Sequence, residues 1–204
     1  MKEHPIIFST DMVRAILEGR KTQTRRVIKP QPKIEIEGQL RTSQETINNA
    51  VSHFTKIVLK CPYGQVGQRL WVREPWYPNP ATCTPIYKAN YPFEKKPQVW
   101  SADAKWKSSV FMPRWASRIN LEITGLRVER LQEITEEDAV AEGIEEWQGM
   151  FREYDKPDSN PGWARDPILS YQTLWDSLNA KRGYGWETNP WVWVIEFRYE
   201  KQEG

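Results

Sequence analysis

Large apolar side chains alternate with smaller or charged ones most clearly near the C-terminus, over residues 191–200 (WVWVIEFRYE). A period of two is typical of a strand, and the tryptophans of this segment are expected in the core. Shorter runs predict further strands at 6–8 and 69–74. The segment 119–131 predicts one or two strands, interrupted at Gly125.

The N-terminal region combines a helix signal with a strand signal. A residue among 9–11 can cap a helix that ends at Gly19, and apolar side chains recur on one face of it. In the following GRKTQTRRVI, alternate positions 22, 24, 26 and 28 predict a short strand. The chain therefore opens with a strand, a helix and a second strand.

Two more helices are predicted in the C-terminal half. Thr135 and Asp138 form a capping-box-like pair ahead of a short helix over 136–143. Asp166 is a suitable N-cap for a longer helix, since Pro167 follows it at the first helical position. The apolar face of that longer helix consists of Tyr171, Leu174, Trp175 and Leu178.

Separated strands, three helices and no regular alternation of the two predict an α+β fold built on a mixed sheet or small β-barrel. The length of 204 residues suits a single domain over 1–204, with insertions at about 30–56, 75–117 and 147–165. The second insertion holds seven of the 15 prolines and four tryptophans. We therefore expect a long loop that is ordered by aromatic packing.

Composition narrows the class of protein. No apolar run approaches the ~18 residues that would cross a bilayer, and the N-terminus lacks a signal peptide, so a cytoplasmic protein without membrane contact is expected. The two cysteines and two histidines predict no disulfide framework and no metal site. The same scarcity disfavours a nucleophile that is activated by histidine.

The net charge of +2 is unevenly distributed. Residues 1–128 carry 21 basic and 10 acidic side chains, whereas residues 129–146 carry one basic and eight acidic ones. A basic body favours nucleotides or other phosphate-bearing partners. Mutual neutralisation of the two parts within the fold is an equally good interpretation.

Motif searches leave one reactive segment. Phosphate loops, dinucleotide fingerprints, HExxH and GxSxG are absent, but GRKTQTRR at 19–26 gathers four cations and two hydroxyls without an acid. A lysine crowded by cations loses proton affinity, so Lys21 could act as a base for a threonine nucleophile. Alternatives are phosphate contact and a solvated surface. Strand alternation would separate Lys21 from Thr24, unless Lys21 lies in the preceding turn or a bulge intervenes.

Five segments together resemble an ASCH domain of the phage- or prophage-encoded type: GRKTQTRR, GQVGQRLWVRE, INLEITGLRVERL, ITEEDAVAEGI and WVWVIEF. They span roughly half of the chain and exclude the three insertions. The resemblance implies a small mixed or antiparallel β-barrel that is related to the PUA domain. One departure is that Gln68 follows Gly67, where the family usually has Gly-Asp.

The resemblance also implies a chemistry. ASCH domains are associated with RNA binding, and one bacterial branch hydrolyses N(4)-acetylcytidine with a lysine, a threonine and a glutamate, without a metal or cofactor. By motif, these catalytic residues fall on Lys21, Thr24 and Glu142. Glu142 could move a proton to the leaving nitrogen or hold Lys21 in place, and it could equally be one of eight acids on a solvated face.

Four further residues are candidate substrate contacts. Arg25 and Arg26 could bind a phosphate or stabilise an oxyanion. Glu74 could accept hydrogen bonds from ribose or base, although it could equally pair with a neighbouring arginine, Arg69 or Arg73. Trp71 could stack on a base.

The functional hypothesis is thus an amidohydrolase that acts on N(4)-acylated cytosine nucleosides. The alternative is a non-catalytic nucleic-acid-binding module, and a ribonuclease ranks last because no histidine pair is present. The expected partners are a modified cytosine nucleoside or RNA.

Overall fold

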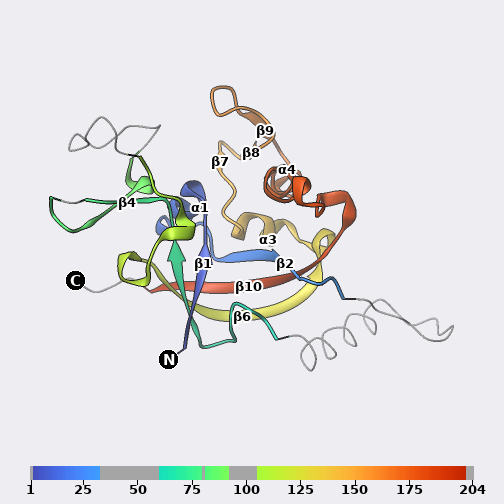
Figure 1. Cartoon of the computed structure of the whole chain (residues 1–204). Helices are drawn as coiled ribbons and strands as arrows, with labels where there is room; N and C mark the ends of the chain where they lie inside the picture. The colour runs from blue at the N-terminus through green and yellow to red at the C-terminus, as the bar shows by residue number, and fades with distance from the viewer. Residues whose placement is uncertain (1, 33–59, 80, 92–104, 201–204) are drawn as a thin grey trace.

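Five strands form the central sheet of the computed structural model, which describes residues 2–32, 60–79, 81–91 and 105–200. The order is β1 (Glu3–Ile7), β3 (Arg69–Arg73), β6 (Asn120–Arg130), β10 (Trp191–Glu200) and β2 (Gln23–Val27). β1 and β3 are parallel, and the other neighbours are antiparallel. The predicted strands are confirmed, and 119–131 forms one strand with a register shift beside Gly125. Figure 1 shows β6 and β10 as long curved neighbours beneath β2.

Within the described ranges, the α-helices are α1 (Thr10–Leu17), α3 (Glu136–Ala141) and α4 (Pro167–Asn179), as predicted. Ser9 Oγ accepts from the Met12 amide at 3.3 Å, and Asp166 Oδ1 accepts from the Ile168 amide at 2.7 Å. Thr135 caps α3 in the same way, but the Asp138 carboxylate contacts two arginines instead of completing a capping box. Short 3₁₀ helices cover 88–90, 109–111, 114–116, 131–133, 180–182 and 186–188.

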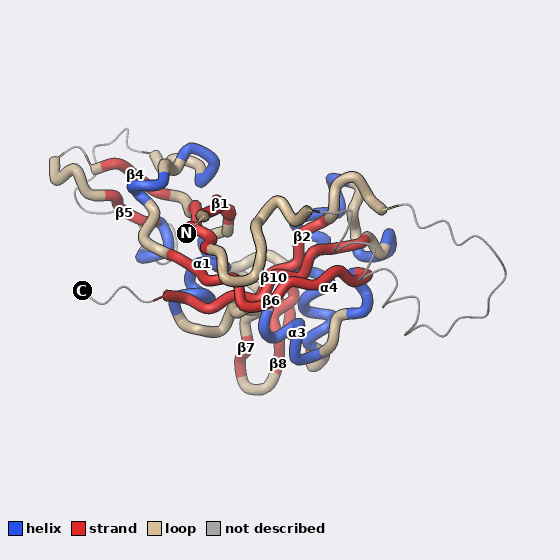
Figure 2. The backbone as a smooth tube through the Cα atoms, turned by 90° about the horizontal axis from the view of Figure 1, so that it is seen from below, coloured by secondary structure: helices blue, strands red, loops and turns tan. Residues whose placement is uncertain are grey.

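Both faces of the first half of β10 are buried, which explains why residues 191–195 are apolar on both sides. Trp191, Trp193, Ile195 and Phe197 pack into a core with α1, β1 and β3. Val192 and Val194, on the opposite face, pack against residues of α3 and α4. The helices therefore pack against opposite faces of β10. In Figure 2, α1 lies toward one end of the sheet, and α3 and α4 lie toward the other.

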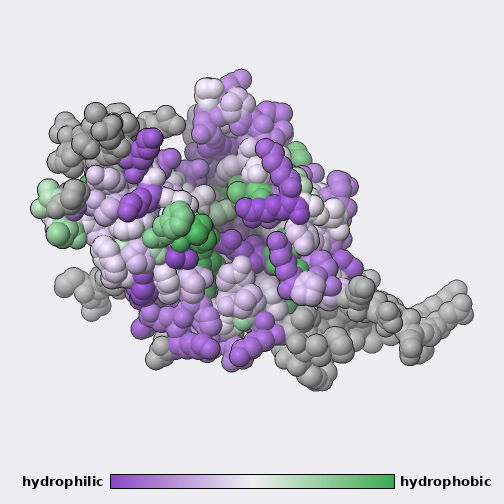
Figure 3. Space-filling model, viewed as in Figure 1, coloured by the Kyte–Doolittle hydropathy of each residue, from purple (hydrophilic) through white to green (hydrophobic). Residues whose placement is uncertain are grey.

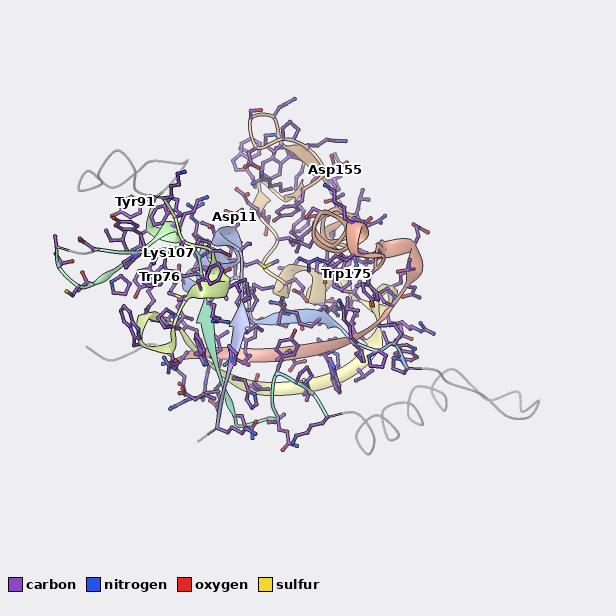
Figure 4. The ribbon with its side chains drawn as sticks, viewed as in Figure 1. Asp11, Trp76, Tyr91, Lys107, Asp155 and Trp175 are labelled. Carbon is purple, nitrogen blue, oxygen red and sulfur yellow. The ribbon has the colours of Figure 1, made fainter. Side chains whose placement is uncertain are left out.

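Two of the predicted insertions contain small sheets. The described part of 75–117 contains β4 (Trp76–Pro78) and β5 (Pro85–Tyr87), and Trp76 and Trp115 pack edge to face, with their centroids 5.9 Å apart. The insertion at 147–165 overlaps a sheet that pattern analysis did not predict: β7 (Glu146–Trp147), β8 (Met150–Glu153) and β9 (Gly162–Ala164). In Figure 4, Trp76 and Lys107 lie in the part of the molecule around β4 (the β4 lobe), and Trp175 lies in the part around α4 (the α4 lobe). Most of the 30–56 insertion lies outside the described residues.

The architecture is α+β, as expected, but the described strands do not close into a barrel. β1 and β2 are the two outer strands, and a side chain links them: Arg26 Nη2 donates to the Ile7 carbonyl at 2.7 Å. The Arg26 guanidinium also lies 5.1 Å from the centroid of the Phe8 ring. Within the ranges above, no helix has the length and apolarity to cross a membrane.

Candidate functional site

Lys21 lies in the connection between α1 and β2, so strand alternation does not govern it. Gly19 ends the helix at φ +78°, and the Lys21 amide then donates to the Ala15 carbonyl at 3.0 Å. The next amide, of Thr22, donates to Ala141 at the end of α3 at 2.9 Å. Lys21 thereby forms an isolated antiparallel bridge with Glu142 before the strand begins at Gln23. This is the turn arrangement that the sequence left open.

The Lys21 side chain is fully buried and is held by one residue twice. Its Nζ donates to Glu142 Oε2 at 2.8 Å and to the Glu142 carbonyl at 2.6 Å, and the Lys21 side chain has 0% exposure. Burial lowers the pKa of Lys21, the Glu142 carboxylate opposes this shift, and the charges of Arg26 and Arg25 reinforce it. The structure thus joins two of the three predicted catalytic residues.

The end of α3 brings Glu142 to Lys21. Glu142 is the C-cap residue, and Gly143 follows at φ +82°. A Cβ on Gly143 would lie 2.6 Å from Lys21 Cβ and 3.0 Å from Ala15 Cβ. Glycine therefore permits both the left-handed turn and the close approach of the helix to Lys21.

Arg25 lies on the sheet face that α3 covers, and its charge is compensated by carboxylates. Its side chain has 0% exposure and contacts Glu129 and Asp138 at 2.6 Å and Glu142 at 3.3 Å. Burial opposes charge on Arg25, but Glu142 and the other carboxylates raise its pKa overall. A guanidinium in this position has no free surface for a phosphate, so the expected substrate contact does not suit it.

A second arginine extends this ionic network toward solvent. Arg127 lies in register with Val194, on the same face as Arg25, and contacts Asp138 at 2.5 Å and Glu129 at 2.9 Å. It also pairs with Glu196, whose side chain is 46% exposed. Burial works to raise the pKa of Asp138, but its bonds to the two arginines lower it overall. The network therefore runs from the surface to the buried Lys21–Glu142 pair.

Thr24 and Arg26 lie on the opposite face of β2, in register with Ile195 and Trp193. Thr24 is 3% exposed, and among the described residues its hydroxyl has no hydrogen-bond partner, Lys21 included. The Lys21 Nζ nevertheless lies 5.6 Å from the centroid of the same Phe8 ring that Arg26 contacts. The amine and the Thr24 face of the strand thus border one aromatic ring.

Arg26 differs from Arg25 in that no described residue provides it with a counter-ion. Across the part of the chain that the structure describes, no carboxylate lies within ion-pair distance of Arg26, and its Nε is buried without a partner. Burial lowers the pKa of this guanidinium. An uncompensated cation beside Lys21 and Thr24 favours contact with an anion or a developing oxyanion. Figure 3 shows the surface hollowed between the β4 lobe and the α4 lobe.

Glu74 and Trp71 are not part of this cluster. Glu74 is 1% exposed, and Arg118 donates to both of its oxygens at 2.9 and 3.1 Å, so neither predicted arginine is its partner. Arg69 instead pairs with Glu200. Burial raises the pKa of Glu74, which Arg118 opposes. Trp71 lies on the outer face of β3, because Leu70 and Val72 on either side of it point into the core.

Tyr171 is a neighbour of the site that sequence reasoning placed only in an apolar helix face. It is 3% exposed, and the Arg25 Cζ lies 5.9 Å from the centroid of its ring. Burial and the Glu142 charge hold its pKa well above the ordinary value. The Tyr171 hydroxyl could have indicated a nearby polar site, because the hydroxyl of a buried tyrosine needs a polar environment. The network partners Glu129 and Asp138 gave no distinct signal among the surrounding acids.

No cluster of three or more potential metal ligands occurs within the described ranges. The carboxylates nearest to Lys21 are occupied by arginines instead. Comparison of the chain with known protein families, with curated proteins and with solved structures finds no match in any of the three.

Proposed function

We propose that this protein is an amidohydrolase that removes the acyl group from N(4)-acylated cytosine nucleosides in the cytoplasm, on a PUA-like ASCH fold that is open between β1 and β2. The observation that carries the proposal is the fully buried Lys21 amine, held 2.8 Å from Glu142. Burial lowers the pKa of such an amine, which can therefore lose its proton more readily than an exposed lysine and serve as a base.

In the proposed reaction, neutral Lys21 Nζ accepts the proton of the Thr24 hydroxyl while Oγ1 attacks the acyl carbon. The tetrahedral intermediate collapses when the bond to the exocyclic nitrogen breaks, and that nitrogen takes the proton from Lys21. Cytidine leaves, and the acyl group remains as an ester on Thr24. Water then attacks the ester with Lys21 as base, which releases the carboxylic acid and restores the hydroxyl.

The other residues have supporting roles. Glu142 holds the Lys21 amine through two oxygens, which supports the orienting role among the two that the sequence suggested. Arg26 adjoins Thr24 on β2 and has donors to spare, so it would stabilise the oxyanion of the intermediate. Attack requires Lys21 Nζ and Thr24 Oγ1 to come within hydrogen-bond distance when substrate binds, a tightening that is common in catalytic sites.

Turnover of N(4)-acetylcytidine, followed by the absorbance change as cytidine forms, tests the proposal. Thr24→Val is expected to lower kcat by about a thousandfold or more, and Thr24→Ser to retain part of it. Thr22→Val is the matched control, because Thr22 is exposed on the same segment. Absence of turnover in the wild type, or equal rates in Thr24→Val and Thr22→Val, would contradict the proposal.

A non-catalytic nucleic-acid-binding module is the second candidate, and Trp71 favours it. The ring lies on the outer face of the sheet, with Arg73 Cζ at 5.2 Å and Arg114 Cζ at 5.9 Å from its centroid. Aromatic and cationic groups together suit a single-stranded nucleic acid. Salt-dependent binding of single-stranded RNA that Trp71→Ala weakens, without any turnover, would favour this candidate.

A further inference from the structure

Arg25 is the group through which the ionic network reaches the Lys21–Glu142 pair. The Glu142 carboxylate is divided between two cations: Oε2 accepts from Lys21 Nζ at 2.8 Å, and Oε1 accepts from Arg25 Nη1 at 3.3 Å. On its other side, Arg25 donates from Nε and Nη2 to Glu129 at 3.1 and 2.6 Å. Asp138 accepts from the same Nη2 at 2.6 Å.

This arrangement fixes the position of the guanidinium from three elements. Glu129 belongs to β6 and Asp138 to α3, while the ring of Tyr171 on α4 lies against the Arg25 Cζ. A planar fork held at both ends has little freedom to rotate. The Glu142 carboxylate is therefore oriented by a neighbour that is itself immobilised.

We propose that Arg25 is a positioning residue of the site, which holds the Glu142 carboxylate against the Lys21 amine and offsets its negative charge so that Lys21 can become neutral. The inference rests on the proposed function for its catalytic meaning, but the charge relationship can be measured without any substrate. Arg25 itself contacts neither the amine nor Thr24 by a hydrogen bond among the described residues, and it acts through Glu142.

The charges that act on Lys21 come from several packed elements. Glu142, at the C-cap of α3, favours the protonated amine, and Arg26 and Arg25 on β2 favour the neutral amine. Tyr171 on α4 stays un-ionised because burial raises its pKa. Asp138 and Glu129 form their ion pairs with Arg25. Removal of Arg25 would leave Glu142 uncompensated and would strengthen its hold on the Lys21 proton.

The test is an NMR titration of the Lys21 side chain in the full-length protein that carries ¹³C-labelled lysine, with Lys21→Arg used to assign the signal. Arg25→Met is expected to raise the titration midpoint of Lys21 by about one pH unit. Glu129→Gln is expected to lower it, because Arg25 then loses one compensating charge. Opposite shifts from two changes in one network are not expected of a merely structural role.

Glu196→Gln is the matched control, since Glu196 contacts Arg127 at the solvent end of the network. In this variant the titration midpoint of Lys21 should stay at the wild-type value. If Arg25→Met fails to fold, the Glu129→Gln titration decides: a lower midpoint supports the proposal, and an unchanged or higher one overturns it. An unchanged midpoint in a folded Arg25→Met also overturns it.

Activity measurements separate this inference from the proposed function. If N(4)-acetylcytidine is hydrolysed, the acidic limb of the pH dependence of kcat/KM should shift to higher pH in Arg25→Met. Activity should then be recovered as the pH is raised. A loss of rate that is equal at every pH contradicts the positioning role. If the wild type has no turnover, the proposed function fails, and the NMR titration still tests the role of Arg25.

Discussion

Lys21 and Glu142 lie 121 positions apart, yet both oxygen-bearing groups of Glu142, its carboxylate and its carbonyl, accept hydrogen bonds from the Lys21 amine. Glu142 is the C-cap of α3, where the carbonyl end of the helix adds negative potential. The amine is therefore held at a favourable electrostatic position, although burial opposes its charge. These opposing influences make Lys21 a measurable probe of the site.

The lowered pKa of Lys21 predicts a pH dependence of stability. The folded-state pKa lies below the ordinary value of 10.5, so protonation favours the unfolded chain. The free energy of unfolding should therefore rise as pH increases from the folded-state pKa toward 10.5, by about 1.4 kcal/mol for each pH unit between the two pKa values. Urea denaturation between pH 7 and 10.5 measures this contribution.

The double variant Lys21→Met/Glu142→Gln is the reference for that experiment, because it replaces the pair with neutral side chains of similar size. Burial, which is the main cause of the raised Tyr171 pKa, is present in both proteins. The wild type should gain stability relative to the variant as pH rises. Parallel curves over this range would show that the Lys21 pKa is not lowered.

Acylation of Thr24 is a direct chemical prediction of the proposed reaction. Rapid acid quenching during turnover of N(4)-acetylcytidine should trap one acetyl group on the protein, on the peptide that contains Thr24. Fragmentation in a mass spectrometer can assign the modified hydroxyl. Acetyl on Lys21 instead would reverse the assigned roles of nucleophile and base, and Thr24→Val should abolish the trapped species.

Gly143 is expected to tolerate substitution poorly. Alanine there adds a Cβ 2.6 Å from Lys21 Cβ to the strain of a left-handed backbone, so Gly143→Ala should destabilise the protein by about 3 kcal/mol. Gly19 is also left-handed but has no atom within 4 Å of an added Cβ. Gly19→Ala should therefore cost only about 1 kcal/mol, and equal losses in thermal unfolding would contradict the steric argument.

Glu74 is expected to stabilise the fold through Arg118 without a part in turnover. Arg118→Met leaves a buried carboxylate unpaired and should destabilise the protein by about 3 kcal/mol at neutral pH. Glu74→Gln in the same protein should recover part of the loss, and both variants should keep the wild-type KM for N(4)-acetylcytidine. A KM increase in Glu74→Gln alone would restore the substrate contact that the sequence suggested.

Local sequence signals predicted the helices and the strands of the central sheet correctly, but not that the sheet stays open instead of closing into a barrel. Alternation located β10 and β6, and caps such as Ser9 and Asp166 located the helices, because these features depend on neighbouring residues. The sheet β7–β9 was not predicted, since strands of two to four residues have too few positions for a period. The missing closure between β1 and β2, and the contact of Arg26 with Ile7 across them, involve residues that are distant in sequence, which no local pattern contains.

The candidate site divides in the same way. The resemblance to ASCH domains pointed to Lys21 and Glu142, and the structure brings them together. It gave no indication of the carboxylates that occupy Arg25, because residues 129–146 contain eight acids and only their three-dimensional positions distinguish Glu129 and Asp138. Two arginines adjacent in sequence thus have different surroundings, since strand alternation directs Arg25 and Arg26 to opposite faces.

The hydrogen bond from Arg26 to the Ile7 carbonyl connects β2 to β1, the two outer strands of the sheet, which are not paired by backbone hydrogen bonds. A guanidinium has five donors, and this contact uses one of them. A ligand oxygen that accepts a hydrogen bond from another Arg26 donor is then connected to both outer strands, β1 and β2. Ligand binding at Arg26 should therefore make the outer strands more rigid. Hydrogen exchange at the amides of β1 should slow when a ligand is bound to Arg26.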